Sequence, residues 1–85
     1  MSNIPNGGSN QYLASGGTGY WSLANSSNSW PGDLVVQAEA LNTNAALYTA
    51  LGNVSRTSSG QYSYSFTVKN NGPNSTYYNI QNSFV

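Results

Sequence analysis

The chain has 85 residues with two basic and two acidic side chains, no histidine and no cysteine, so its formal net charge is zero. Without cysteine it has no disulfide framework and no thiolate ligands for zinc or iron–sulfur clusters. Charged residues make up 5% and aromatic residues 13% of the sequence, which favours a folded domain over a disordered chain. At this length we expect one domain with a thin core.

The N-terminal segment 1–10 contains only Asn, Gly, Ser and Pro besides Met1 and Ile4. So little apolar surface does not repay the entropy that the chain loses on ordering. We therefore expect a flexible tail at 1–10 and a single β domain at 11–85. The segment also lacks the positive charge and the apolar run of a Sec signal peptide.

The sequence after the tail has the pattern of an all-β protein. Short runs of β-branched and aromatic residues alternate with polar residues and are broken by clusters of Gly, Pro, Asn and Ser. The strands expected between these clusters are 18–23, 34–41, 54–57, 61–69 and 76–80. The most apolar of them, 34–41, is far shorter than the ~20 residues of a membrane helix, so no membrane span is predicted.

The segment 61–69 is the clearest strand, because aromatic or apolar residues from Tyr62 to Val68 alternate with Ser and Thr. The turn before it ends in Gly60, which suits a hairpin with strand 54–57. The turn chemistry of 70–73 then predicts a second hairpin to strand 76–80. Together these three strands would form a meander.

The segment 44–51 is ambiguous. Asn44 is a good helix N-cap, the following residues favour helices, and Gly52 stands where a helix would end. Helices this short are marginal in water, however, and the apolar residues from Leu47 to Val54 can equally form a strand that feeds the hairpin. We favour the strand and keep a short helix at 44–51 as the alternative.

The run from Tyr62 to Pro73 is Tyr-Ser-Tyr-Ser-Phe-Thr-Val-Lys-Asn-Asn-Gly-Pro. It resembles the penultimate strand of bacterial immunoglobulin-like repeats, in which an alternating strand ends in Asn-Gly-Pro before the last strand. These repeats are small β-sandwiches, so the resemblance implies an immunoglobulin-like fold. It also implies a bacterial surface or secreted setting, and it supplies no catalytic residues.

Most catalytic and ligand-binding chemistries lack their residues here. The absence of histidine and cysteine excludes the serine–histidine and cysteine–histidine triads. The only carboxylate side chains, Asp33 and Glu39, would lie ~20 Å apart on one extended strand, too far for a glycosidase pair. Arg56 and Lys69 are too few cations to neutralise a nucleic acid backbone. We expect no enzyme activity, cofactor, metal or nucleic acid.

Aromatic residues are the remaining signal for binding. Neighbouring residues on a strand point to opposite faces, so in Tyr20-Trp21 and in Tyr77-Tyr78 one ring should face the core and the other should not. Exposed Tyr and Trp beside amide side chains are typical of protein interfaces and of carbohydrate-binding platforms. The candidate binding surface consists of Tyr20, Trp21, Trp30, Tyr62, Tyr77 and Tyr78. In the alternative interpretation, Trp21 fills the core and the tyrosines cap its rim.

We therefore predict an all-β fold, either a small antiparallel sandwich or a meander, with five to seven strands. The expected function is a non-enzymatic interaction or structural module that binds a protein partner or a second copy of itself. Uncharged strands such as 62–68 leave edge pairing unopposed, which favours this function. Carbohydrate binding through Trp21 or Trp30 is the alternative.

Overall fold

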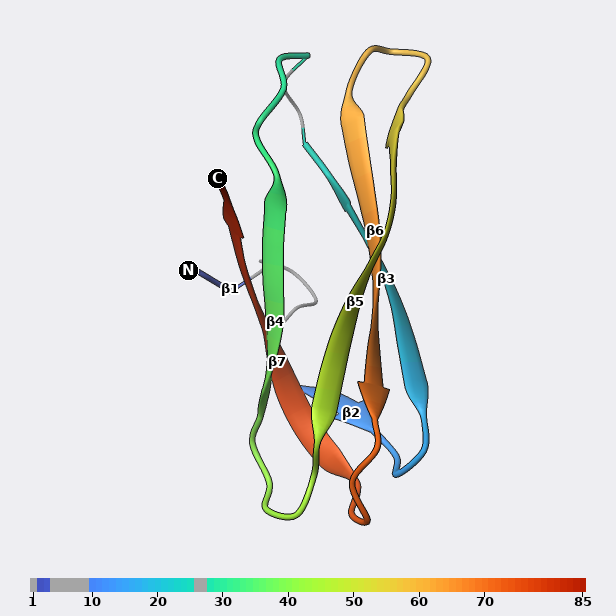
Figure 1. Ribbon diagram of the computed structural model, residues 1–85, viewed down its shortest axis with the longest axis vertical. Coiled ribbons are helices and arrows are strands. Elements are labelled where there is room, and N and C mark those ends of the chain that lie inside the picture. Colours follow the sequence, from blue (N-terminus) through green and yellow to red (C-terminus); the bar gives the residue numbers. More distant parts are fainter. Residues whose placement is uncertain (1, 4–9, 26–27) are drawn as a thin grey trace.

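The computed structural model describes residues 2–3, 10–25 and 28–85, and these form two antiparallel β-sheets packed against each other, without a helix (Figure 1). The strands are β1 (Ser2–Asn3), β2 (Gln11–Leu13), β3 (Thr18–Ala24), β4 (Leu34–Ala40), β5 (Leu47–Arg56), β6 (Tyr62–Asn70) and β7 (Thr76–Phe84). In one sheet β7 is central, with β4 on one side and both β1 and β2 on the other. The second sheet has the order β3-β6-β5. The predicted β-sandwich is confirmed.

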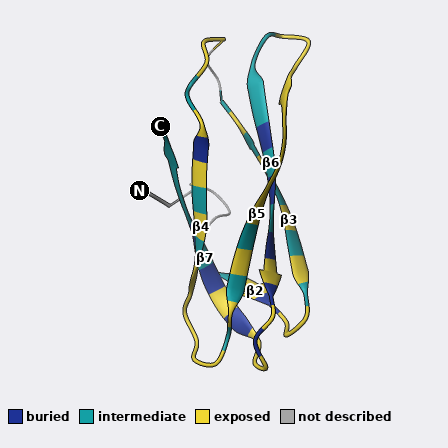
Figure 2. Ribbon diagram, viewed as in Figure 1, coloured by how far each residue is buried: buried dark blue, intermediate teal, exposed yellow. Residues whose placement is uncertain are grey.

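The core lies between the two central strands, β6 and β7. Seven apolar or aromatic side chains are buried, namely Leu13, Leu34, Tyr64, Phe66, Val68, Tyr78 and Ile80. Most of them occupy alternate positions of β6 and β7, because a strand with neighbours on both sides presents every second side chain to the opposite sheet (Figure 2). The alternation expected for 61–69 therefore identifies the inner face of the second sheet.

The helix alternative for 44–51 is wrong. Leu47–Arg56 is a strand that pairs with β6 from Leu47 opposite Asn70 onward. Pairing with β6 gives the backbone of this segment hydrogen-bond partners along a full ladder, whereas a helix of two turns would leave most of its terminal groups unpaired. Asn44 lies in the preceding loop with a φ of 59°.

The first predicted hairpin is confirmed and the second is wrong. Gly60, with a φ of 90°, closes the turn between β5 and β6, and its N–H donates to the Thr57 carbonyl (2.9 Å). β6 and β7, however, belong to different sheets, so the 71–75 connection crosses from one layer to the other. Both strands carry apolar side chains at alternate positions. These side chains bury each other when the two strands face one another from opposite sheets.

The predicted tail at 1–10 falls largely outside the described residues, which exclude residue 1 and residues 4–9. The described part is paired: Ser2 and Asn3 form β1 opposite Asn82 and Gln81, and the N–H of Asn10 donates to Asn79 Oδ1 (2.8 Å). The described part of the chain contains no helix that is long and apolar enough to cross a membrane.

Candidate binding site

The six aromatic residues proposed as a binding surface are spread over the molecule. The prediction for the two neighbouring pairs is confirmed, because Tyr20 is 82% and Tyr77 46% exposed, whereas Tyr78 is buried at 2%. Trp21 is half-buried, and its Nε1–H donates to the Tyr78 hydroxyl (3.0 Å). Tyr78 is thus a core residue and not part of an open surface.

A second pair of the six, Trp30 and Tyr62, also lies together. The rings of Trp30 and Tyr62 meet edge to face, with their centroids 5.1 Å apart and their planes at 80°. Trp30 also lies 5.8 Å from the ring of Tyr64, and the guanidinium of Arg56 sits over Tyr62 at 4.9 Å. Trp30 keeps 51% of its surface exposed. The other two, Tyr20 and Tyr77, lie on the outer faces of β3 and β7.

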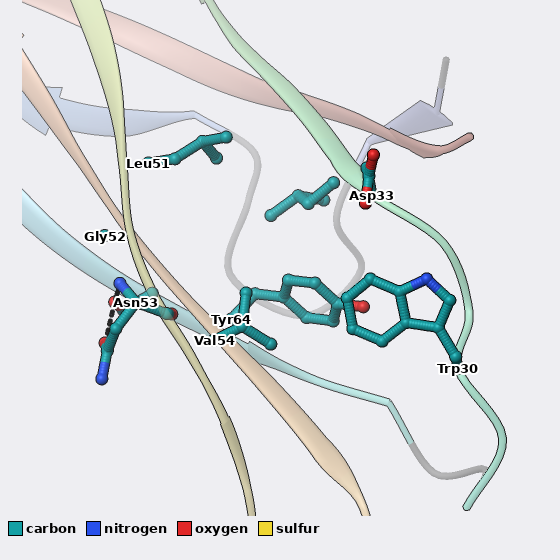
Figure 3. Close-up of a pocket in the computed structure, with 9 residues that line it drawn as sticks. Trp30, Asp33, Leu51, Gly52, Asn53, Val54 and Tyr64 are labelled. Atoms are coloured by element: carbon teal, nitrogen blue, oxygen red, sulfur yellow. Dashed lines mark hydrogen bonds between the residues drawn. The ribbon is translucent and has the colours of Figure 1, made fainter.

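A pocket of about 260 Å³ opens beside Trp30 (Figure 3). It is lined by Trp30, Asp33, Leu34, Leu51, Gly52, Asn53, Val54, Tyr64 and Ser65. One wall is the segment that enters β4, and the other wall is β5 with the underlying part of β6. Figure 3 shows the rings of Trp30 and Tyr64 along one side and Leu51 at the far end of the pocket.

The wall that carries Trp30 is held in place by backbone contacts. Gly32 has a φ of +115°, a conformation that favours glycine, and a Cβ there would lie 2.6 Å from the carbonyl oxygen of Val85. The Tyr64 hydroxyl donates to the Gly32 carbonyl (2.8 Å). Asp33 and Val85 exchange two backbone hydrogen bonds, of 2.8 and 2.9 Å, which extend the β4–β7 ladder. The backbone that follows Trp30 is therefore fixed by the sheet.

The opposite wall is shaped by a bulge in β5. The register with β6 shifts between Leu51 and Val54, and Ser65 stabilises the shift: its hydroxyl donates to Asn53 Oδ1 (2.7 Å) and accepts from the Asn53 N–H (2.9 Å). Gly52 lies so close to Ser65 that a Cβ at this position would overlap the Ser65 hydroxyl. The bulge thus turns β5 away from the regular ladder next to the pocket.

Two apolar side chains that flank the bulge lie on the inner face of the sheet and are uncovered. Leu51 lies opposite Phe66 and Val54 opposite Tyr64, and directly opposed residues of a β-ladder share one face of the sheet. Phe66 and Tyr64 are buried at 1% and 2%, but Leu51 is 61% and Val54 49% exposed. Figure 2 shows this exposure along the later part of β5. The second sheet therefore presents core-facing apolar surface that the first sheet does not cover.

The electrostatics of the pocket are simple. Asp33 carries the one carboxylate among the pocket-lining residues. The pKa of the Tyr64 hydroxyl is raised, mainly by burial and to a lesser extent by the negative charge of Asp33. Within residues 2–3, 10–25 and 28–85, no three acidic, histidine or cysteine side chains come together as metal ligands. What the lining offers is apolar and aromatic surface with a few polar groups at its rim, a combination typical of binding sites.

No family model matches the chain, and no curated protein or solved structure is significantly similar to it. The sequence indicated Trp30 and Tyr62 as binding residues, but not Leu51, Val54 or Asn53. The signal for these three is the Gly52-Asn53 pair inside a run of strand-forming residues, since an isolated glycine in a strand suggests a bulge.

Alkaline pH is expected to destabilise the fold through two core tyrosines. Burial raises the pKa of both Tyr64 and Tyr78, and the hydrogen bond from Trp21 offsets this only in part at Tyr78. Above the ordinary phenol pKa of about 10, the unfolded chain has released these protons while the folded chain still holds them, so stability falls as the pH rises.

Urea denaturation measured between about pH 8 and 12 should therefore show a midpoint that is constant at first and falls above about pH 10. Tyr64→Phe should lessen the fall, and Tyr20→Phe, at an exposed ring, serves as the control. A fall of the same size in wild type and Tyr64→Phe would contradict the role of Tyr64.

Proposed function

We propose that the protein is a non-enzymatic interaction module that binds a protein partner by burying one of the partner's large apolar side chains in the Trp30 pocket. The observation that carries this proposal is the exposure of Leu51 and Val54, which belong to the inner face of the sheet but lack a covering layer. Completely burying a Leu or Val side chain gains about 1.5–3 kcal/mol, and a partner that covers the exposed parts of Leu51 (61%) and Val54 (49%) would gain roughly half of this for each.

The dimensions and chemistry of the pocket favour a side chain over a flat ligand. A volume of about 260 Å³ accommodates one aromatic or large aliphatic group, and the walls at Leu34, Leu51 and Val54 are aliphatic. Tryptophan is enriched among residues that dominate the energy of protein interfaces. Asp33 at the rim can accept a hydrogen bond from the partner's backbone or from a polar group next to the buried side chain.

Selection from a random-peptide display library tests this proposal with a defined probe. Peptides enriched on the wild-type protein should share an apolar anchor residue and should lose at least about tenfold in affinity for Trp30→Ala. Tyr20→Ala removes a ring elsewhere that is more exposed, at 82% against 51% for Trp30, and should leave the affinity unchanged. Failure to enrich any peptide, or equal binding by Trp30→Ala, would refute the proposal, provided that the variant keeps a dispersed ¹H–¹⁵N spectrum.

Carbohydrate binding is the second candidate, and the exposed indole of Trp30, which lines the same pocket as Asp33 and Asn53, favours it. A sugar would stack on the ring and use the carboxylate and the amide as hydrogen-bond partners. A glycan array followed by titration of the tryptophan emission distinguishes the two candidates. Sugar-dependent emission that disappears in Trp30→Phe would favour the lectin-like function, and a silent array would favour the protein partner.

A bacterial surface or secreted setting is part of the same proposal. It is supported by the resemblance of the β6 sequence to immunoglobulin-like repeats and by the small antiparallel sandwich that contains it. Domains of this kind present binding surfaces on a rigid scaffold. Detection of the protein by antibody on intact cells, with a cytoplasmic protein as control, tests this setting.

A further inference from the structure

We propose that two copies of this chain associate by pairing their β3 strands antiparallel, which joins the two β3-β6-β5 sheets into one continuous sheet. An unpaired sheet edge presents a row of backbone N–H and C=O groups that another strand can bind, and proteins usually protect such edges by a small set of devices. β3 is the edge strand of this molecule on which those devices are missing.

The other described edges are protected. β1 and β2 are two and three residues long, too short to form an extended ladder. β5 carries the bulge at Gly52-Asn53 and the charged Arg56. β4 carries Glu39, and its edge is partly occupied because the Thr49 hydroxyl of β5 donates to the Val36 carbonyl (3.2 Å). Each of these features opposes pairing with another strand.

β3 has none of these features. Its ladder with β6 is regular over all seven residues, from Thr18 opposite Lys69 to Ala24 opposite Ser63. The strand contains no charge, no proline and no bulge, and β6 is the one strand that it pairs with among the described residues. Tyr20, at 82%, is the most exposed of its aromatic residues. Within the part of the chain that the structure describes, this edge is therefore regular, neutral and unpaired with any further strand.

The direction of the free backbone groups follows from the register. The N–H of Asn25 donates to the Tyr62 carbonyl (2.9 Å), so the odd-numbered positions of β3 form hydrogen bonds with β6. In an antiparallel ladder the intervening residues direct their N–H and C=O groups to the opposite side. Thr18, Tyr20, Ser22 and Ala24 thus point these groups away from the sheet, where a second strand would receive them.

A second copy of β3 fits this edge in a self-complementary register. When a two-fold axis passes next to Trp21, Thr18 lies opposite Ala24 of the second copy and Tyr20 opposite Ser22, so all seven residues overlap. Every hydrogen-bonding position of one strand then meets a hydrogen-bonding position of the other. No charge faces a like charge, and the net charge of zero leaves little repulsion between whole molecules. This match favours a second copy over an unrelated strand.

The proposed dimer is independent of the partner-binding function, because β3 and β5 flank β6 on opposite sides and the Trp30 pocket lies at β5. Each proposal can therefore fail without the other. In the dimer the two pockets would lie at the outer edges of a joined sheet, so the protein would present two binding sites to its partner.

Sedimentation velocity and ¹H–¹⁵N spectra recorded from about 10 µM to about 1 mM test the dimer. The wild type should change from monomer to dimer, with peak shifts concentrated at 18–24. Ser22→Lys places a charge on the edge and should raise the dissociation constant at least about tenfold. Gln37→Lys adds the same charge at an exposed position of β4 and should leave it unchanged. A monomer at all concentrations, or equal effects of both variants, would overturn the proposal.

Cysteine substitutions test the register, because the natural chain has no cysteine. In the proposed dimer, Tyr20 of one copy lies opposite Ser22 of the other at a Cα separation of about 5.5 Å, within the range of disulfides. An oxidised equimolar mixture of Tyr20→Cys and Ser22→Cys should give mainly the mixed disulfide. A product made only of the two homodimers would overturn this pairing of β3.

Discussion

Asn70→Ala is expected to destabilise the fold by about 3–4 kcal/mol, because it removes a side chain that joins three loops at the same end of the sandwich. Asn70 is fully buried. Its Nδ2 donates to the carbonyls of Leu13 (3.3 Å) and Asn74 (2.8 Å). Its Oδ1 accepts from the N–H groups of Gly72 (3.0 Å) and Ala46 (3.4 Å). Alanine leaves these backbone groups without their partner, and the groups of Leu13 and Gly72 are buried away from water.

The loss is large relative to the whole stability, which for a chain of this size is roughly 4–13 kcal/mol. The neighbouring Asn71 provides a matched control, since its side chain is exposed. Urea denaturation should show a much lower midpoint for Asn70→Ala and a midpoint close to wild type for Asn71→Ala. If the two variants were equally stable, the hydrogen-bonding role of Asn70 would be refuted.

The role of Asn70 illustrates which parts of the fold are encoded locally. The sequence Asn70-Asn71-Gly72-Pro73 correctly predicts a chain reversal, because these residues favour turns through their own backbone conformations. It does not reveal that the turn crosses between sheets, since this depends on partners such as Leu13 and Ala46, which are 57 and 24 residues away. Local patterns therefore locate the turn and miss its tertiary function.

The strands were predictable for a similar reason. The alternation from Tyr62 to Val68 is a local property, and it identifies both the strand and its buried face. The segment from Leu47 onward was ambiguous, because alanine and leucine suit either structure and pairing with β6 decides between them. Its long ladder with β6 is a property of the whole fold, not of the segment.

The candidate site was predictable only in part. The rule that neighbouring residues alternate showed that one ring of Tyr20-Trp21 is exposed, but it does not specify which one. Trp30 and Tyr62 come together because the sandwich brings the segment before β4 next to the start of β6. The exposure of Leu51 depends on how far the first sheet extends over the second, which no local pattern encodes.

Gly72→Ala is expected to cost about 3 kcal/mol, although the φ of Gly72 is not in the left-handed region. A Cβ at Gly72 would lie 2.6 Å from the backbone nitrogen of Ala46 and 2.7 Å from the Cα of Ala45. These are backbone atoms, so no side-chain rotation relieves the overlap. The loop at 44–46 would have to move away, which also breaks the hydrogen bond between Ala46 and Asn70.

Gly16→Ala is the informative comparison, because Gly16 has a φ of +77° but no atom within 4 Å of an added Cβ. It should cost only the conformational penalty of about 1 kcal/mol. Denaturation of the two variants side by side therefore separates close packing from backbone conformation as the reason for glycine. A cost for Gly16→Ala as large as that for Gly72→Ala would mean that backbone conformation, not the contact with the 44–46 loop, dominates at this end of the sandwich.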